Sequence, residues 1–391
     1  MREVVIAGYL RTPISRSRPK QPERDVFNSI RADELAIIVV KKLVEKTEID
    51  PKEIDECIMG CTNQTAEQWS YGGRLISLGA GLPLEVSAMC IDRQCGSAMT
   101  AIHVGAMEII CGYSDIVIAG GYEHMTHVPM GFNVKPNFKL LKEEKRFDWT
   151  IAMNMGLTAE KLAEETGISR EEMDKWAYRS HMLAVKAYEE GFFKDEIIPV
   201  EVTLPDGTKK VIDRDMSVRP DTTFEKIASL PPVFKPRGVI TAGNSSPLNA
   251  GAGAVLLMSK EKAKEYSLEP LAKIKGISWA GVDPSVMGKG PVPATKKLLK
   301  KVGLKIGDID FWEINEAFAV VTLYAIKELG VDPDKVNVKG GSIAIGHPLG
   351  MTGARLVGTL ARILNLEDGK YGIATMCCGG GQGVSTLIEK E

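Results

Sequence analysis

Apolar runs alternate in the first third of the chain with stretches whose apolar positions repeat at helical spacing. Val4–Gly8 predicts a buried strand, and Asp33–Lys46 predicts an amphipathic helix. A helix over Met99–Ile110 and an apolar strand over Asp115–Gly121 continue the pattern. Strands and helices that alternate in this way predict an α/β fold, with a mainly parallel sheet that helices cover on both faces.

The same order of elements returns near the end of the chain. The segment PKEIDECIMG (51–60) corresponds in position to KIGDIDFWEIN (305–315), and in each half an apolar strand that runs into glycines follows. We therefore expect a duplicated α/β unit, which would bring Cys95 of the first half opposite His347 of the second. Such sheets build their sites at the carboxyl ends of parallel strands, so this pair is a candidate site.

The middle of the chain differs from both halves. Helices are predicted over Thr158–Glu165 and Arg170–Glu190, with a short polar hairpin, LPDGTKK (204–210), and interspersed charges. We interpret this part as a cap inserted into the first half. The division is then 1–123 with 249–270 for the N-terminal half, 124–248 for the cap, and 271–391 for the C-terminal half.

Composition excludes several classes of protein. The 391 residues are 44% hydrophobic and 26% charged, an ordinary globular balance, and 49 basic against 51 acidic residues give a formal charge of −2. A near-neutral chain lacks the basic surface of a general nucleic-acid binder. Seven cysteines fit no secreted disulfide framework, and no stretch approaches the roughly 18 apolar residues of a membrane span. We expect a cytoplasmic protein that is neither exported nor membrane-inserted.

The first candidate for chemistry is Cys95, in the motif IDRQCGSAM between an apolar strand and a helix of small residues. At a helix N-terminus, the dipole and the unpaired N–H groups favour the thiolate, which is the nucleophilic form of cysteine. The motif alone leaves open a buried structural cysteine.

The second candidate is His347, in the glycine-rich run GGSIAIGHPLGMTGAR (340–355). Glycines let the backbone approach a ligand closely, and an imidazole among them can reach a thiol, so a Cys–His pair is the natural use. A phosphate loop is disfavoured because histidine stands where lysine must neutralise phosphate. A structural histidine is the remaining alternative.

Two further motifs carry candidate polar groups. In MCCGGGQG (376–383), consecutive N–H groups from Gly379 onward can form an oxyanion hole and Cys377 can act as an acid or base, although a plain turn has the same pattern. In EINEAFA (313–319), Asn315 either holds a water or carbonyl oxygen or caps the following helix, and the segment alone favours the cap.

Other chemistries find no support in the sequence. The cysteine spacings and the run EHMTH (123–127) match neither zinc-knuckle spacing nor HExxH, so we predict no metal site. GxGxxG, GxSxG and Walker motifs are missing, which argues against nicotinamide chemistry and serine hydrolysis. His103 and His181 lie in helical patterns and are interpreted as ordinary, partly buried residues.

The ordered set of motifs resembles the thiolase family over essentially the whole chain. The motifs are CGSA with Cys95, NEAFA with Asn315, GGSIAIGHPLG with His347, and CCGGGQG with Cys377. The resemblance implies the thiolase fold, with two duplicated βαβαβαββ halves that form a layered α-β-α-β-α core and an inserted loop domain. It also implies an acyltransferase that reversibly cleaves 3-oxoacyl-CoA with CoA to give acetyl-CoA and a shortened acyl-CoA.

The resemblance further implies a role for each site residue. Cys95 would carry the acyl group, His347 would activate Cys95, and Cys377 would move the proton at the acetyl-CoA α-carbon. Asn315, through a water, and His347 would form one oxyanion hole, and the backbone N–H groups of Cys95 and Gly379 would form the other.

The substrate and partners follow from the same resemblance. CoA would be a substrate rather than a cofactor, with Arg219 packed on its adenine and Ser246 near its pantetheine arm. No other cofactor is implied. A homodimer or homotetramer, and association with other β-oxidation enzymes, are the expected assemblies.

Three alternatives stay open. A condensing enzyme of the ketoacyl-synthase or hydroxymethylglutaryl-CoA synthase kind shares the fold but lacks the second cysteine, Cys377. A strictly short-chain acetoacetyl-CoA thiolase is disfavoured because Asn154 stands where biosynthetic members carry histidine. A catalytically silent scaffold or lipid carrier should have lost one of the four motifs.

Five positions depart from the family pattern without removing a reacting group: Asp92, Ala98, Pro247, Ala250 and Cys378. Of these, Asp92 adds a negative charge three residues from the nucleophile, and this charge should raise the pKa of Cys95.

Overall fold

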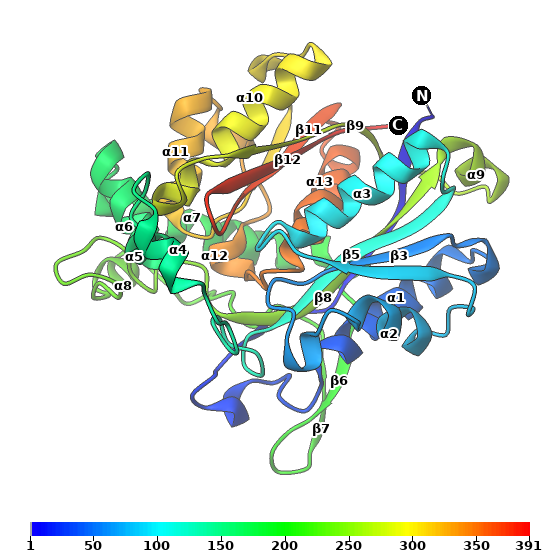
Figure 1. Cartoon of the computed structure of the whole chain (residues 1–391), viewed down its shortest axis with the longest axis horizontal. Coiled ribbons are helices and arrows are strands. Elements are labelled where there is room, and N and C mark those ends of the chain that lie inside the picture. The colour runs from blue at the N-terminus through cyan, green and yellow to red at the C-terminus, as the bar shows by residue number, and fades with distance from the viewer. Residues whose placement is uncertain (1) are drawn as a thin grey trace.

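Ten strands form one sheet in the computed structural model, which describes residues 2–391 (Figure 1). Their order is β10-β11-β12-β9-β1-β8-β5-β3-β4, with β2 beside β8. The strands are β1 Val4–Arg11, β2 Ser15–Arg16, β3 Glu56–Gly60, β4 Ser87–Ile91, β5 Ile116–His124, β8 Asn249–Ser259, β9 Ala272–Gly281, β10 Phe311–Ile314, β11 Tyr371–Cys378 and β12 Gln382–Glu389. A separate hairpin pairs β6 (Val200–Thr203) with β7 (Lys209–Ile212).

The predicted duplication is confirmed by strand order. The first half reads β1-β8-β5-β3 and the second reads β9-β12-β11-β10, with matching directions at each junction. The halves meet where β1 pairs with β9, at Val5–Lys273 and Ile6–Ala272. The segments at 51–60 and 305–315 contain β3 and β10, and each of these strands pairs in parallel with the corresponding strand of its half, β5 and β11.

The expectation of a mainly parallel sheet is wrong. Only β3–β5, β3–β4 and β10–β11 are parallel among the strand pairs of this sheet within residues 2–391, and the central pairs are antiparallel. The sequence pattern could not reveal this, because β8 and β12 are buried on both faces. An apolar run of that kind has the same composition whether the strand pairs in parallel or antiparallel.

The helices and the two halves of the sheet form five layers, in the order α-β-α-β-α that the predicted fold class implies (Figure 1). The helices are α1 Ala32–Thr47, α2 Gly72–Gly79, α3 Ser97–Cys111, α4 Phe138–Glu143, α5 Trp149–Ala152, α6 Met155–Thr166, α7 Arg170–Glu189, α8 Phe224–Ala228, α9 Lys260–Glu265, α10 Pro291–Val302, α11 Ala319–Leu329, α12 Ser342–Ile345 and α13 Thr352–Leu366. α3 and α13 pack together between the two halves of the sheet, α1 covers the outer face of the first half, and α10 covers that of the second. The central layer therefore holds the start of one helix from each half.

A glycine pair lets the halves approach each other. We expected the strand to run into glycines at Gly121, yet β5 continues to His124 and pairs with β8 as far as Ala250. A Cβ at Gly121 would collide with the carbonyl oxygen of Gly350, so only glycine admits the C-terminal loop here. This close contact holds the loop before α13 against the first half.

The segment between β5 and β8 carries α4–α8 and the hairpin, and a buried ion-pair cluster fixes it to β1. The Arg11 guanidinium donates to Glu196 at 2.8 Å and to Asp215 at 2.7 and 2.9 Å, and all three side chains are fully buried. α7 begins with a capping box, in which Ser169 and Glu172 satisfy each other's backbone N–H groups. The predicted division into two halves and a cap stays an interpretation.

Candidate active site

A cavity of about 470 Å³ opens above the starts of α3 and α13. Cys95 and His347 both line it, as the duplication predicts, and Ser246 and Asn154 lie on its wall. Asn154 is also the N-cap of α6, where its side chain accepts a hydrogen bond from Leu157 N at 3.2 Å. The remaining wall is largely apolar.

Cys95 lies two residues before α3, in a tight turn where Gln94 adopts a left-handed φ of 50°. Burial raises the pKa of its thiol to about 12; the backbone N–H of Gly379 lowers this pKa, whereas Glu123 and Asp92 raise it. The expectation that the helix N-terminus favours the thiolate is therefore wrong, because the cost of burying the charge outweighs the dipole. The effect of Asp92 has the expected sign. The resting nucleophile is a neutral thiol that needs a base.

Hydrogen bonds hold His347 at its backbone nitrogen and at Nδ1. Its backbone N–H donates to Asn249 Oδ1 at 2.7 Å, and its Nδ1 lies 2.7 Å from Thr352 Oγ1. Thr352 donates its own hydrogen to the carbonyl oxygen of Pro348 at 2.8 Å, so it accepts from Nδ1–H and Nε2 carries the lone pair. Burial lowers the pKa of His347 to about 3, and the charge of Arg355 lowers it further. A neutral imidazole whose Nε2 carries the lone pair can accept a proton.

Asn315 contacts His347 rather than capping a helix. Its Nδ2 lies 3.3 Å from His347 Nε2, and both side chains are buried. The cap interpretation is wrong, because α11 begins only at Ala319 and Phe318 occupies the N-cap position. Asn315 does not line the cavity itself, and its amide reaches the site through His347.

Cys377 and Cys378 point to opposite faces of β11. Cys377 belongs to the same apolar cluster as Met287 and Phe318, which line the cavity, whereas Cys378 packs behind the nucleophile turn, where a Cβ at Gly96 would lie 2.6 Å from its sulfur. Burial raises the pKa of Cys377, and so, to a smaller degree, does the nearby charge of Cys95. Both are free thiols, as are the other five cysteines.

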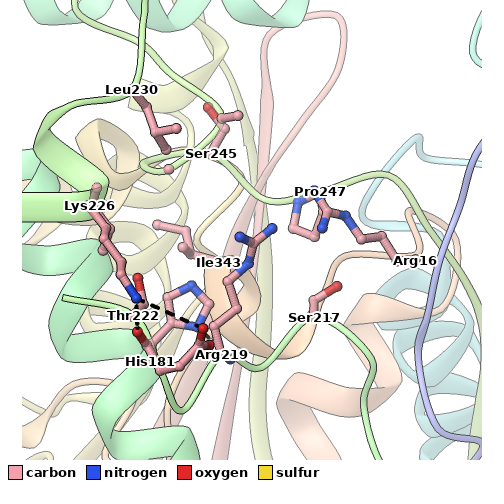
Figure 2. Close-up of a pocket in the computed structure, with 14 residues that line it drawn as sticks. Arg16, His181, Ser217, Arg219, Thr222, Lys226, Leu230, Ser245, Pro247 and Ile343 are labelled. Carbon is pink, nitrogen blue, oxygen red and sulfur yellow. Dashed lines mark hydrogen bonds and ion pairs between the residues drawn. The ribbon is translucent and has the colours of Figure 1, made fainter. Parts of the chain in front are cut away.

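A second cavity of about 290 Å³ adjoins the first, and four residues line both: Arg16, Ala242, Ser245 and Pro247. In Figure 2 the guanidinium groups of Arg16 and Arg219 are turned toward the same space, with His181 and Lys226 beside them. Burial lowers the pKa of Arg16 to about 10, and the charge of Arg219 lowers it further. Such converging positive charges suit an anionic ligand.

His181 lies on α7, as its helical pattern predicts, and its side chain also lines a cavity. It is buried, lines the second cavity, and its Nδ1 lies 3.4 Å from the backbone nitrogen of Arg219. Helical periodicity places His181 on α7 but does not show which loop crosses that face. The sequence therefore carried no signal that His181 lines a cavity.

Sequence reasoning also missed two residues that position the site. Thr352 fixes the ring of His347, as described above, and Glu123 accepts hydrogen bonds from the backbone nitrogens of Thr62 (3.1 Å) and Gly350 (2.9 Å). Glu123 thereby joins the loops of both halves from beneath the cavity. Its place two residues after Gly121, at the end of β5, was the available signal.

Neither a metal-binding cluster nor a membrane-spanning helix occurs in residues 2–391. Across residues 2–391, no three His, Cys, Asp or Glu side chains are grouped so that they could hold a metal ion. In the same part of the chain, every helix is too short or too polar to cross a membrane.

Comparison with known proteins gives one consistent family. Residues 4–261 match the family model described as thiolase, N-terminal domain, and residues 268–390 match thiolase, C-terminal domain. The chain is 46% identical to proteins named 3-ketoacyl-CoA thiolase from Marinobacter nauticus and from Vibrio vulnificus; each alignment covers 100% of this chain, with 98% and 100% of the respective relative.

Solved structures agree in fold. An acetyl-CoA acetyltransferase of Bacillus anthracis matches with a TM-score of 0.88 and 40% identity, over 100% of this chain and 99% of that one. Human mitochondrial 3-ketoacyl-CoA thiolase in complex with CoA matches with a TM-score of 0.89 and 36% identity, over 100% and 98%. With both of its halves matched by the family models and its full length matched by these relatives, the chain belongs to the thiolase family.

Proposed function

We propose that this enzyme cleaves 3-oxoacyl-CoA with CoA, giving acetyl-CoA and an acyl-CoA shortened by two carbons, through an acyl group on Cys95. The observation that carries the proposal is the joining of two cavities, one with Cys95 and His347 on its wall and one with converging positive charges. A CoA thioester matches both cavities. Its anionic phosphates suit the positive charges of the second cavity, and its reactive carbonyl, at the far end of a narrow arm, suits the first. The names of the relatives support the same reaction.

In the first half-reaction, His347 Nε2 takes the proton of Cys95 and the sulfur attacks the 3-oxo carbon. The bond between C2 and C3 then breaks, which leaves the acyl group as a thioester on Cys95 and releases the enolate of acetyl-CoA. Cys377 gives its proton to the enolate carbon. Preorganised donors stabilise such oxyanions, and we assign the N–H groups of Cys95 and Gly379 to the acyl oxygen and Asn315, through a water, with His347 to the enolate oxygen.

In the second half-reaction, a new CoA gives its thiol proton to the Cys377 thiolate and attacks the thioester carbon. The Cys95 sulfur leaves and regains its proton from His347. Every proton is thus returned, and the protein ends in its starting state. Arg219 is assigned to the adenine of CoA and Ser246 to the pantetheine arm, because they line the second and the first cavity respectively.

Substrate length is the finer part of the proposal. We propose that acyl chains longer than four carbons are accepted, because the first cavity has a largely apolar wall. Its apolar lining includes Met125, Met130, Met155, Phe234 and Leu248. Each further buried methylene should contribute about 0.8 kcal/mol, a factor of about four in kcat/KM.

The test is a thiolysis assay that follows loss of the 3-oxoacyl thioester from four to eight carbons. kcat/KM is expected to rise with chain length. Activity on acetoacetyl-CoA alone would make the enzyme a short-chain acetyltransferase, like the Bacillus anthracis neighbour by its name. No thiolysis with any chain length, together with a Cys95 that stays unacylated, would favour the silent scaffold.

We further propose a homodimer or homotetramer in a reducing, cytoplasmic environment, with a role in β-oxidation beside the enzymes that make the 3-oxo group. β4 lies at the edge of the sheet and pairs only with β3 within the described chain, and an edge with unpaired backbone groups favours assembly. Exposed apolar side chains surround it: Trp69, Tyr71, Leu75, Leu78 and Leu84. Seven free thiols suit a reducing compartment. Sedimentation equilibrium measures the assembly.

A further inference from the structure

We infer that Ser342 is a positioning residue that fixes the amide of Asn315 in the orientation the reaction needs, and that Arg355 sets the direction of the Ser342 hydroxyl. This inference rests on the proposed function of His347 and Asn315. It concerns two residues outside the cavity wall, and it follows from which atoms can donate a hydrogen bond.

The chain of hydrogen bonds begins at a buried ion pair. The Arg355 guanidinium lies 2.5 Å from Glu313 Oε2 through Nη1 and 2.9 Å from Ser342 Oγ through Nη2. All three side chains are buried. A guanidinium has donors only, so the Ser342 oxygen must accept from it.

The single hydrogen of Ser342 is therefore directed elsewhere. Ser342 Oγ lies 2.6 Å from Asn315 Oδ1, and this oxygen accepts the hydrogen. With its oxygen held by Ser342, the Asn315 amide turns its Nδ2 donors toward His347 Nε2, 3.3 Å away. A flipped amide would place an oxygen against the lone pair of Nε2.

The opposite end of the chain agrees with this direction. Pro348 O takes the hydrogen of Thr352, Thr352 takes the hydrogen of Nδ1, and Nε2 is left as an acceptor. The donor-only guanidinium and the acceptor-only carbonyl thus impose one polarity on every group between them. Ser342 is the only link between Arg355 and Asn315 in the hydrogen bonds of the part of the chain that the structure describes.

The test is a double-mutant cycle on kcat for thiolysis. Ser342→Ala removes the hydroxyl with little change of volume, and kcat should fall about tenfold with KM unchanged, because the amide loses its fixed orientation. In the Asn315→Ala background the same change should have no further effect, since no amide is left to position. Ser342→Thr, which restores a hydroxyl, should recover most of the activity.

A matched control and a second readout separate positioning from packing. Ser77→Ala removes another buried hydroxyl, one that donates to the carbonyl oxygen of Arg74 at 2.9 Å within α2, and should keep wild-type kcat. A crystal structure of the Ser342→Ala variant should show Asn315 in more than one rotamer or with its oxygen turned toward His347. If Ser342→Ala does not fold, Ser342→Cys, a weaker donor of similar volume, takes its place with the same expected direction.

The contrary results are equally defined. Wild-type kcat in Ser342→Ala, an equal fold-loss in both backgrounds, or a single unchanged Asn315 rotamer would overturn the inference while leaving the proposed function intact. A wild-type enzyme without thiolysis would overturn the proposed function, and the rotamer of Asn315 would still decide the inference.

Discussion

The two halves of the molecule place different chemistry at the same position. In the first half, the chain enters α3 through a turn that presents Cys95; in the second, it enters α13 through a loop that presents His347. Burial acts oppositely on them, raising the pKa of the thiol and lowering that of the imidazole. Both groups rest neutral, so the duplicated scaffold supplies the geometry and the exchanged side chains supply an acid facing a base.

The surroundings of the two side chains differ as well. A carboxylate, Glu123, ties the loops of the first half to Gly350, whereas hydrogen-bonded neutral groups hold His347. A negative charge near Cys95 opposes its ionisation, and a positive charge near His347 opposes its protonation. The surroundings of both residues therefore disfavour the thiolate of Cys95 and the imidazolium of His347 in the enzyme without substrate.

The largest expected effect is the loss of Cys95. Cys95→Ala should lower thiolysis by at least about a thousandfold, because Cys95 is the proposed carrier of the acyl group. Incubation with acetyl-CoA, acid quenching and mass spectrometry of peptides should find the acyl group on Cys95. An adduct on Cys377 or Cys378, with Cys95 bare, would mean that the first half does not carry the nucleophile.

Next in size is the removal of Cys377. Cys377→Ala should reduce condensation and deuterium exchange at the acetyl methyl about a hundredfold or more, while acylation of Cys95 stays measurable. Cys378→Ala is the matched control and should remain active, because its side chain points to the other face of β11. The reverse outcome would place the α-proton acid one residue later.

The pH dependence of Cys95 tests the neutral resting pair. With its pKa raised to about 12, the thiolate fraction should increase about tenfold per pH unit from 7 to 10, without a plateau. Alkylation by iodoacetamide, measured by mass spectrometry on the Cys95 peptide of a Cys111→Ala variant, should follow this slope. A plateau below pH 8 would show a thiolate–imidazolium pair instead.

The smallest effect is expected at the second cavity. Arg219→Ala should raise KM for CoA about fivefold to tenfold and leave kcat nearly unchanged, since the residue lies away from the reacting atoms. Arg146→Ala, which removes an exposed arginine elsewhere, should leave both constants unaltered. A fall in kcat alone would show that Arg219 acts on chemistry rather than on binding.

The sequence predicted what repeats and missed what depends on packing. The duplication brought Cys95 and His347 together correctly, because matched segments occupy matched places in a repeated fold. Strand direction failed, since an apolar strand buried on both faces has no directional signature. Asn315 was misread because the helix starts three residues later than a cap at this position requires.

Electrostatics failed for a related reason. The pKa of Cys95 is dominated by burial, which no local motif records. No local motif records the position of His181 on the second cavity either, because that position depends on the loop that carries Arg219 across α7. Local sequence identifies the side chains of a site, whereas the fold determines how deeply they are buried and which charges surround them.

The shared wall between the two cavities has a consequence for the order of events. Arg16, Ala242, Ser245 and Pro247 line both cavities, so in the proposed reaction incoming and outgoing thioesters would use one corridor. Acetyl-CoA must vacate it before the second CoA can enter, which dictates a ping-pong sequence with parallel double-reciprocal lines. High concentrations of free CoA should then occupy the corridor of the unacylated enzyme and inhibit turnover. The rate would therefore depend on the ratio of CoA to acyl-CoA.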